Sequence, residues 1–416
     1  MIRNLASELE QCLSTESLNM VRAAGELAGE LRLGLYLVGG AVRDILLGRA
    51  NFDLDMVVEG DAPKLASQLA QREGDEIVVH RRFGTAKLRR KKVSFDFATA
   101  RAETYAHPGA LPTVRPGSIG DDLRRRDFTI NAMAIHLDQD NFGKLVDPCG
   151  GENDIENRLI RILHKKSFTD DATRMLRAIR YEQRFDFQLE TNTETLLHRD
   201  LAMLKTISGD RIRHELELIL KEDLPERMLQ RAGELGVLGE IHPSLQGNGH
   251  LREVFQQARS ITRSPAIALY FSLMLYHHSQ QEGEDFIARL RLPRSIARAI
   301  RDTLDLKENV FFLSTAQLSP SDIYELLEGH HPLSILANAI YSDSVLQRKR
   351  LYLYLNKLRS VKTELDGEAL QQMGIPPGPG MGEMLRALHE ARLDQRVKSR
   401  EEEEELVRQW INRQTR

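Results

Sequence analysis

The pattern of hydrophobic and polar positions divides the chain near residue 165. Before that point, short runs rich in β-branched residues alternate with turns, which is typical of strands. These runs predict strands at Leu35–Val38, Phe52–Val58, Glu76–His80, Thr85–Leu88, Val93–Thr99 and Lys144–Asp147. Between them, Pro63–Gln71 and the stretch after Arg43 have the pattern of helices. The first part of the chain is therefore predicted to be an α+β domain, with a mixed or antiparallel sheet and flanking helices.

Beyond Thr169 the strand pattern disappears, and helical periodicity continues to the end of the chain. Glycine and proline interrupt it near Gly233–Gly239, Pro243–Gly249, Pro293 and Pro376–Gly382. The acidic run Glu401–Glu405 is predicted to be a solvated helix face. The whole remainder is therefore expected to be all-α.

Composition favours a cytoplasmic protein without a membrane partner. The chain has 416 residues, enough for about two to four domains. Its two cysteines, Cys12 and Cys149, do not make a disulfide framework. The first residues are amphipathic and acidic, unlike a signal peptide, and no run approaches the roughly 18 apolar residues of a membrane span.

The charges nearly balance, with 58 Lys and Arg against 61 Asp and Glu. This excludes a uniformly basic coat for nucleic acid, so phosphate contacts would need local patches. The densest patch lies in one hairpin-like segment and consists of Arg81, Arg82, Lys87, Arg89, Arg90, Lys91 and Lys92. These side chains could bind phosphates, or they could be the solvated bases of an exposed hairpin.

A strand that ends in two glycines precedes two alternating aspartates. Gly39 and Gly40 end the strand and open a helix, where free backbone N–H groups can meet an anion. Asp53 and Asp55 alternate on the next strand, so both carboxylates point to one face. Such oxygens repel each other unless a cation lies between them, and they suit Mg²⁺ that carries substrate phosphates. The alternative is a turn followed by a polar surface strand.

A third acid, Asp96, lies in the otherwise apolar strand Val93–Thr99. A carboxylate there is costly unless it faces a cation or a hydrogen-bonding site. Asp96 is therefore a third candidate at the same site, and an acid on an exposed edge is the alternative.

Five segments between about residues 35 and 220 match, in order, the motifs of a known family. They are Gly39–Gly48 with Asp53–Asp55, Asp122–Ala132, Asp147–Ile155, Asp170–Arg174 and Asp210–Glu215. They resemble the class II tRNA nucleotidyltransferases (CCA-adding enzymes) and bacterial poly(A) polymerases, of the polymerase-β-type superfamily. Asp170 and Asp210 stand where the family usually has Glu. The resemblance implies a catalytic head (1–165), a nucleotide-selecting helical neck (166–221), a helical body (222–330) and a tRNA-binding helical tail (331–416).

The second motif contains the candidates for ribose recognition. Asp127 and Asn131 are four residues apart, on one face if the segment is helical, and both can hydrogen-bond a hydroxyl group. The resemblance implies that they help to select ribonucleotides. As an alternative, Asp127 could cap the segment Phe128–Ile135. Nucleotide binding is also predicted for Gly39, Gly40, Arg43 and Arg126.

In the fourth motif, Asp171 and Arg174 share a face if they lie on one helix. A carboxylate accepts from the amino group of cytosine or adenine, and a guanidinium donates to the neighbouring ring nitrogen. Uracil and guanine present the opposite pattern. The alternative is an ordinary ion pair within a helix. Arg177 and Arg180 follow at three-residue spacing and are candidates for triphosphate binding.

The resemblance implies template-independent addition of CMP and AMP, from CTP and ATP, to the 3′ end of tRNA. Two Mg²⁺ ions would be held by Asp53 and Asp55, with Asp96 as a further candidate. The alternatives are an enzyme that adds only A, a CC-adding enzyme, a poly(A) polymerase and a catalytically silent RNA-binding protein.

Two further segments bear on RNA. RNA binding is predicted for Arg89, Arg90, Lys91 and Lys92, and for Gly378 and Gly380 in the glycine-rich turn that precedes the last long helices. The resemblance implies that this tail holds the tRNA elbow, although the turn could also be a rigid connector. The polar stretch Ala100–Asp121 is either a connector or a lid. The resemblance implies that the corresponding loop is shorter in family members that add only CC.

Overall fold

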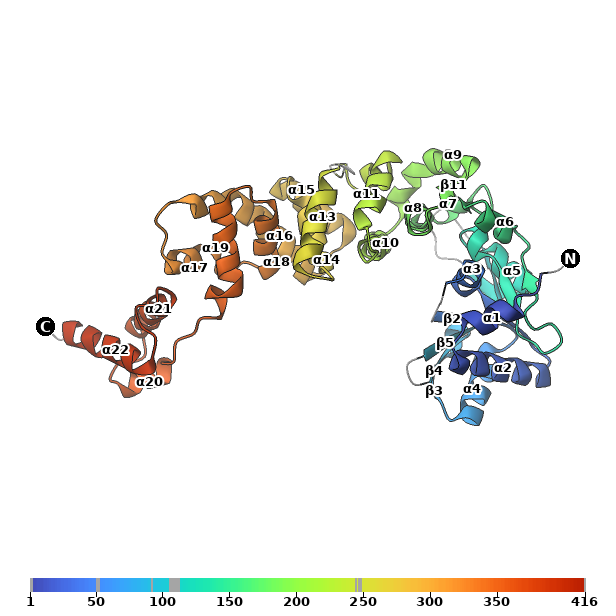
Figure 1. Cartoon of the computed structure of the whole chain (residues 1–416), viewed down its shortest axis with the longest axis horizontal. Helices are drawn as coiled ribbons and strands as arrows, with labels where there is room; N and C mark the ends of the chain where they lie inside the picture. Colours follow the sequence, from blue (N-terminus) through green and yellow to red (C-terminus); the bar gives the residue numbers. More distant parts are fainter. Residues whose placement is uncertain are drawn as a thin grey trace. The chain divides into compact units, whose positions relative to one another are not determined.

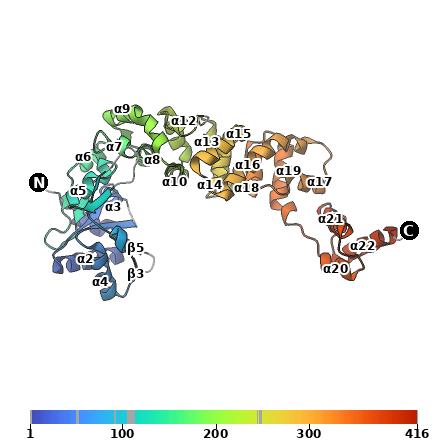
Figure 2. The ribbon, with the colours of Figure 1, turned by 180° about the vertical axis from the view of Figure 1, so that it is seen from behind.

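The computed structural model describes residues 3–49, 53–90, 93–104, 113–243, 245 and 249–414. The chain divides into two compact units, Met1–Gly247 and Asn248–Arg416 (Figures 1 and 2). The four-part division into head, neck, body and tail stays a prediction.

Within the described residues of the first unit, seven strands form one mixed sheet. Their order across the sheet is β3 (Glu76–His80), β4 (Thr85–Arg90), β5 (Val93–Thr99), β2 (Asp53–Glu59), β1 (Gly34–Val38), β8 (Ala134–His136) and β9 (Leu145–Val146). Strands β2 and β5 run parallel, and the other neighbours are antiparallel. The predicted mixed sheet is thus confirmed, and each predicted strand overlaps an observed one.

Apolar side chains on alternate positions attach this sheet to helices. Leu54, Phe95 and Leu88, on β2, β5 and β4, are at most 1% exposed. Helices α2 (Thr15–Glu30) and α4 (Ala62–Glu73) contact each other and cover that face (Figure 1). The alternate positions of the same strands therefore point to the opposite face, where Asp53 and Asp55 lie.

Short helices and helical turns complete the head and connect it to the helices that follow. These are α1 (Ala6–Cys12), α3 (Gly40–Leu46), η1 (Arg81–Phe83), α5 (Ile119–Arg124), η2 (Thr129–Asn131) and α6 (Gly151–Glu156). The described residues that follow in the first unit are mainly helical, with α7 (Ser167–Asp170), α8 (Thr173–Phe185), α9 (Thr191–Asp200), η3 (Leu201–Thr206), α10 (Gly209–Leu220), α11 (Pro225–Glu234) and α12 (Val237–Ile241).

Two strand pairs differ from the predicted pattern. Strands β6 (Arg101–Thr104) and β7 (Thr113–Pro116) pair with each other inside the stretch that carried no strand signal. Strand β10 (Leu159–Ile160) pairs with β11 (Gln188–Leu189), so the prediction that strands end before Thr169 is wrong. Both pairs are short, and β10 and β11 are hydrogen-bonded although they lie far apart in the sequence, which no local periodicity reveals.

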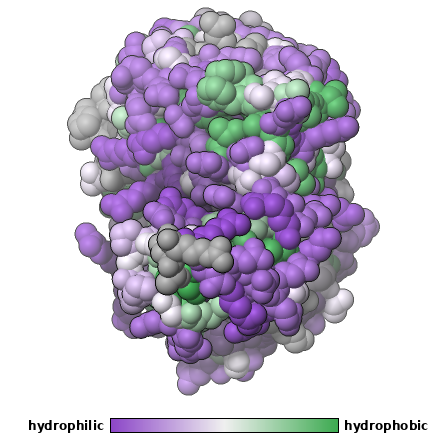
Figure 3. Space-filling model, turned by 90° about the vertical axis from the view of Figure 1, so that its left-hand side faces the viewer, coloured by the Kyte–Doolittle hydropathy of each residue, from purple (hydrophilic) through white to green (hydrophobic). Residues whose placement is uncertain are grey.

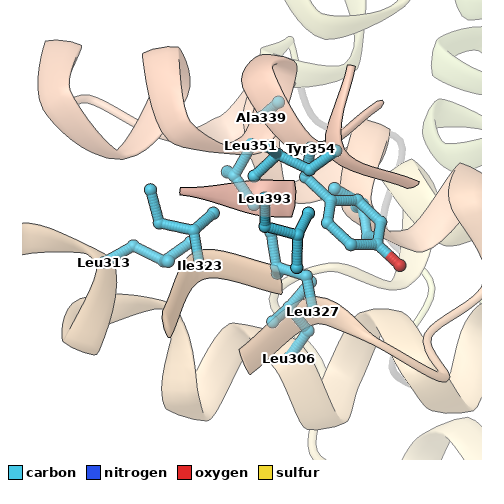
Figure 4. Packing of buried hydrophobic residues seen from close by; sticks show 10 residues of the cluster. Leu306, Leu313, Ile323, Leu327, Ala339, Leu351, Tyr354 and Leu393 are labelled. Atoms are coloured by element: carbon cyan, nitrogen blue, oxygen red, sulfur yellow. The ribbon is translucent and has the colours of Figure 1, made fainter. Parts of the chain in front are cut away.

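The second unit is helical throughout its described residues, as predicted. Its elements are α13 (His250–Ile261), α14 (Ile267–Leu275), α15 (Gln280–Leu290), α16 (Arg294–Asn309), η4 (Val310–Ser314), α17 (Pro320–Leu327), α18 (Pro332–Tyr341), α19 (Val345–Asn356), η5 (Leu358–Ser360), α20 (Gly367–Gln372), α21 (Pro379–Leu393) and α22 (Arg400–Gln414). One hydrophobic cluster joins Leu306, Leu327 and Leu351 to Leu393 at the end of α21 (Figure 4). A second cluster joins α20, α21 and α22.

The acidic run Glu401–Glu405 opens α22, and its member Glu403 contradicts the predicted solvated face. Glu403 is fully buried. Its carboxylate accepts hydrogen bonds from the backbone N–H groups of Glu364 (3.0 Å) and Leu365 (2.8 Å) and from the Arg392 guanidinium. Because successive side chains point around a helix, one of the five adjacent acids faces the interior, where the backbone N–H groups and the guanidinium need an acceptor.

The surface in Figure 3 is mostly hydrophilic, and hydrophobic residues gather on it in a few patches. In the part of the chain that the structure describes, no helix combines the length and the apolar character that crossing a membrane requires.

Candidate active site

One cleft in the first unit gathers residues that are far apart in the sequence. Its volume is about 690 Å³. It is lined by all ten residues predicted for nucleotide binding, namely Gly39, Gly40, Arg43, Arg126, Asp127, Asn131, Asp171, Arg174, Arg177 and Arg180. The acids Asp53 and Asp55 line it as well, whereas Asp96 does not belong to its lining. The fold thus brings together the first, second and fourth motifs.

Strand β2 presents the two acids as its alternation predicts. Asp53 and Asp55 point to the cleft, while Leu54 between them is 1% exposed. In the parallel pairing of β2 with β5, Asp55 lies beside Asp96, whose Oδ2 accepts a hydrogen bond from Nζ of Lys87 (2.8 Å). Burial and the neighbouring carboxylate of Asp96 raise the pKa of Asp55. The carboxylates of Asp55 and Asp96 therefore repel each other across the two strands.

The donor set fits Mg²⁺ that binds together with a substrate. Among the described residues, no three His, Cys, Asp or Glu side chains are grouped closely enough to hold a metal by themselves. Mg²⁺ commonly uses one or two protein carboxylates and completes its shell with water and substrate phosphates. Asp53 and Asp55 supply hard oxygen donors on one face of β2, and the carboxylate of Asp96 lies beside Asp55 on the neighbouring strand.

The diglycine turn brings the second motif over the end of β1. Gly39 has φ +68°, and a Cβ atom there would lie 2.6 Å from Nη1 of Arg126. Arg43, one turn into α3, is 5% exposed, donates to Oδ1 of Asn131 (2.6 Å) and lies over the ring of Phe185 (4.5 Å). Glycine suits this position because the left-handed φ strains other residues, and a side chain here would also displace the tip of Arg126. Arg43 connects α3 to α8.

The second motif forms a network rather than a helix face. The motif begins in α5, but from Asp127 onward only Thr129–Asn131 is helical, as a 3₁₀ turn, so neither the α-helical spacing nor the helix cap predicted for Asp127 is observed. The two side chains nevertheless meet, since Nδ2 of Asn131 donates to Oδ1 of Asp127 (3.0 Å). Oδ2 of Asp127 accepts from Nη2 of Arg177 (2.7 Å). Burial alone would raise the pKa of Asp127, but Arg177 and Asn131 outweigh it and hold this pKa below its ordinary value.

The fourth motif also differs from the predicted geometry. Asp171 has an extended backbone (φ −148°) and precedes α8, so it does not share a helix face with Arg174. Both still line the cleft. Arg174 is 5% exposed and donates from Nη1 to Oγ of Ser167 (2.7 Å) and from Nη2 to the carbonyl oxygen of Arg125 (3.0 Å). A turn between α7 and α8, not helical periodicity, brings the pair together.

Sequence reasoning missed Asp122 and Arg125. Asp122 is fully buried, and its two oxygens accept from Arg125 (2.6 Å) and Arg126 (2.9 Å). Arg125 also lines the cleft. The signal was present, because an acid three and four residues before two arginines can pair with both on a helical turn.

Comparisons with known proteins agree with this geometry. A family model described as "Poly A polymerase head domain" matches residues 35–161, and one described as "Probable RNA and SrmB- binding site of polymerase A" matches residues 186–247. The A-adding tRNA nucleotidyltransferase of Halalkalibacterium halodurans is 33% identical over 98% of this chain and 96% of its own length. The chain belongs to the class II tRNA nucleotidyltransferase and poly(A) polymerase family.

Other members of the family extend this result. The A-adding tRNA nucleotidyltransferase of Geobacter sulfurreducens is 34% identical over 96% of this chain, which spans about half (48%) of that protein. The structure of the Thermotoga maritima CCA-adding enzyme complexed with tRNA matches 99% of this chain with a TM-score of 0.77 and 32% identity. A CCA-adding enzyme with ATP matches 100% of it with a TM-score of 0.83 and 31% identity. Further relatives are named CC-adding or CCA-adding enzymes.

The residues predicted for RNA binding on β4 differ from one another in exposure and in their partners. Arg89 is exposed on β4. Arg90 is held by Asp75 (2.7 Å) and Glu73 (2.6 Å), so much of its charge is already offset. Lys91 and Lys92 lie outside the described residues, as does Tyr105–Pro112 of the candidate lid.

The two tail glycines lie at the start of α21. Gly378 precedes its first residue, with φ +153°, and Gly380 packs against Trp410 of α22, 3.6 Å from where a Cβ atom would be. The turn thus opens a helix as predicted, and the space beside Gly380 would admit a Cβ atom in ordinary contact with Trp410. RNA binding by all these residues stays a prediction.

Proposed function

We propose that this protein adds AMP from ATP to the 3′ end of tRNA and releases pyrophosphate. One observation supports the proposal. A single cleft of about 690 Å³ is lined both by two carboxylates that fit Mg²⁺ and by a pair of side chains that can hydrogen-bond a base edge. A site for metal-assisted phosphoryl transfer and a site for template-free base selection then serve one bound nucleotide.

The reaction joins the 3′ oxygen of the RNA to the α-phosphorus of the nucleotide, and the bond from that phosphorus to pyrophosphate breaks. Asp53 and Asp55 would hold Mg²⁺, which neutralises phosphate charge and favours loss of the proton from the hydroxyl. Seven arginines and six acids stand among the described residues of the lining, so positive charge from the arginines is available to the triphosphate.

Base selection is assigned to Asp171 and Arg174. Within the described residues, Arg174 donates three of the five N–H groups of its guanidinium to Ser167 and to the carbonyl oxygen of Arg125, so two can donate to a base. Asp171 accepts from the amino group of adenine or cytosine, and Arg174 donates to the adjacent ring nitrogen. With uracil or guanine, acceptor would face acceptor and donor would face donor.

Ribose recognition is assigned to Asp127 and Asn131. Oδ2 of Asp127 accepts from both Nε (2.9 Å) and Nη2 (2.7 Å) of Arg177. Oδ1 accepts from the backbone N–H of Phe128 (2.9 Å) and from Nδ2 of Asn131 (3.0 Å). Because each carboxylate oxygen has two lone-pair positions, a ribose hydroxyl group would have to replace one of these donors, and Asn131 would then turn to the hydroxyl group. The pairing with Arg177 keeps the Asp127 carboxylate charged, and a charged acceptor makes the stronger hydrogen bond to a ribose hydroxyl.

Complete CCA addition, the activity expected from the sequence, is the second candidate. AMP addition is the step shared by enzymes that add A alone and by those that add CCA. Three relatives with 33–35% identity are named A-adding. A solved CCA-adding enzyme is 33% identical to this chain, and a CCA-adding enzyme with CTP matches it with a TM-score of 0.81. Contacts with the tRNA elbow through Gly378 and Gly380, and location in the cytoplasm, stay predictions within the same proposal.

Three primers test the proposal directly. Purified protein with Mg²⁺, CTP and ATP is given tRNA that ends before CCA, after C, or after CC. Extension of the CC-ended tRNA alone means A addition, and extension of all three to CCA means complete addition. A long tail on an unstructured RNA would instead reveal a poly(A) polymerase, and binding without extension of any primer would reveal a silent RNA-binding protein.

A further inference from the structure

Helix α10 presents charged side chains to residues that line the cleft. Arg211 pairs with Asp171 (2.7 Å), and Glu215 pairs with Arg177 (3.4 Å) and Arg180 (3.6 Å). Arg211 and Glu215 are one helical turn apart and therefore share one face of α10. This helix forms a second layer behind the side chains that face the nucleotide.

The Asp171 carboxylate is held at both of its oxygens. Oδ1 accepts from the backbone N–H (3.0 Å) and the hydroxyl (2.7 Å) of Thr173, and Oδ2 accepts from Nη2 of Arg211 (2.7 Å). The side chains of Asp171 and Arg211 are 20% and 33% exposed. Because Oδ2 has a second lone-pair position, it can accept from a base while it remains bonded to Arg211.

We infer that Arg211 is a positioning residue for base selection: it fixes the plane of the Asp171 carboxylate, so that Asp171 and Arg174 are aligned to the same base edge. The inference rests on the proposed function of that pair. It adds a residue that comes 40 positions after Asp171 and that need not touch the nucleotide itself.

The local backbone explains why Asp171 needs this support. It lies between α7 and α8, in extended conformation, so no helix holds its side chain. Without Arg211, Thr173 would restrain one oxygen, and the carboxylate could turn about that contact. Uracil and guanine are rejected when the Asp171 carboxylate faces an acceptor of the base and the Arg174 guanidinium faces a donor at the same time. A carboxylate that has turned away no longer faces the base edge, so this rejection weakens.

The test measures kcat/KM for ATP, CTP, UTP and GTP on CC-ended tRNA. For Arg211→Met we expect kcat/KM for ATP to fall about tenfold or more, the effect of losing one charged hydrogen bond. We expect UTP to lose less, so that the ATP-to-UTP ratio falls, and Arg211→Lys to restore part of that ratio. A role in folding alone would lower all four values together.

Arg213→Met is the matched control, because Arg213 pairs with Asp210 and Glu217 on α10 itself and does not line the cleft. It should keep the wild-type ratio. If Arg211→Met does not fold, Arg211→Gln makes the same comparison with Arg213→Gln. A wild-type ATP-to-UTP ratio in a folded Arg211 variant overturns the inference. Absence of any incorporation by the wild type would instead refute the proposed function.

Discussion

Replacement of Glu403 by glutamine tests how the last helices are held together. The carboxylate accepts from two backbone N–H groups, at Glu364 and Leu365, and from Arg392. An amide has one acceptor oxygen, so in either orientation its NH₂ group faces a donor. A buried donor without an acceptor costs about 1–3 kcal/mol, and removing one partner of a buried ion pair costs about 3–5 kcal/mol. We expect Glu403→Gln to lower the free energy of unfolding of this region by about 3 kcal/mol.

The chain contains a suitable reporter and a suitable control. Its single tryptophan, Trp410, packs in the hydrophobic cluster of α20, α21 and α22, so its fluorescence follows unfolding of that cluster. The free energy of unfolding falls by about 1–3 kcal/mol per molar urea, so the urea concentration at the midpoint of unfolding should fall by about 1 M or more. Glu405→Gln, in the same acidic run but with a 59% exposed side chain, should change the free energy by less than about 0.5 kcal/mol. Equal midpoints for the two variants would refute the role assigned to Glu403.

Three further predictions concern the cleft. Asp53→Ala should abolish nucleotide incorporation while tRNA binding, measured by gel shift, stays largely intact; undiminished incorporation would contradict the metal assignment. Arg174→Ala should blur the choice of C and A, seen as misincorporation of UTP and GTP, and unchanged selectivity would count against the base-reading pair. Because the pKa of Asp127 is lowered in the folded protein, its pairing stabilises the fold above about pH 4 and is lost as the pH falls further. Asp127→Asn should therefore flatten the acid dependence of unfolding, and an unchanged profile would argue against that pairing.

The local sequence pattern predicted those parts of the site that depend only on the repeat of side-chain directions along a strand or a turn. The alternation around Asp53 and Asp55 sent both carboxylates to one face of β2, and the diglycine turn opened α3 as expected. The order of the motifs then identified ten residues that the fold collects in one cleft. The acid pair and the junction were predictable because a strand of period two and a strand-to-turn-to-helix junction need no distant partner. The ten residues came from the family resemblance, and their binding of a nucleotide stays a prediction.

Predictions that assumed a continuous helix failed. Asp171 and Arg174 have helical spacing, but the chain turns between α7 and α8, and the second motif forms a 3₁₀ turn. Asp127 and Asn131 still form a hydrogen bond, because buried polar groups must find partners. The side chains of Asp171 and Arg174 bond to other residues and share only the lining of the cleft. Spacing thus predicted which residues reach the cleft, but not the geometry that places them there.

The sequence by itself determined the class of fold, the acid pair and the residues available for nucleotide chemistry. Only the tertiary structure decided which charges are already paired: Arg90 with Asp75, Asp171 with Arg211, and Glu403 with Arg392. An isolated helix would leave such side chains in water, where pairing has little value. Burial removes the water, and each charge must then bond to whatever partner the packed elements bring within reach.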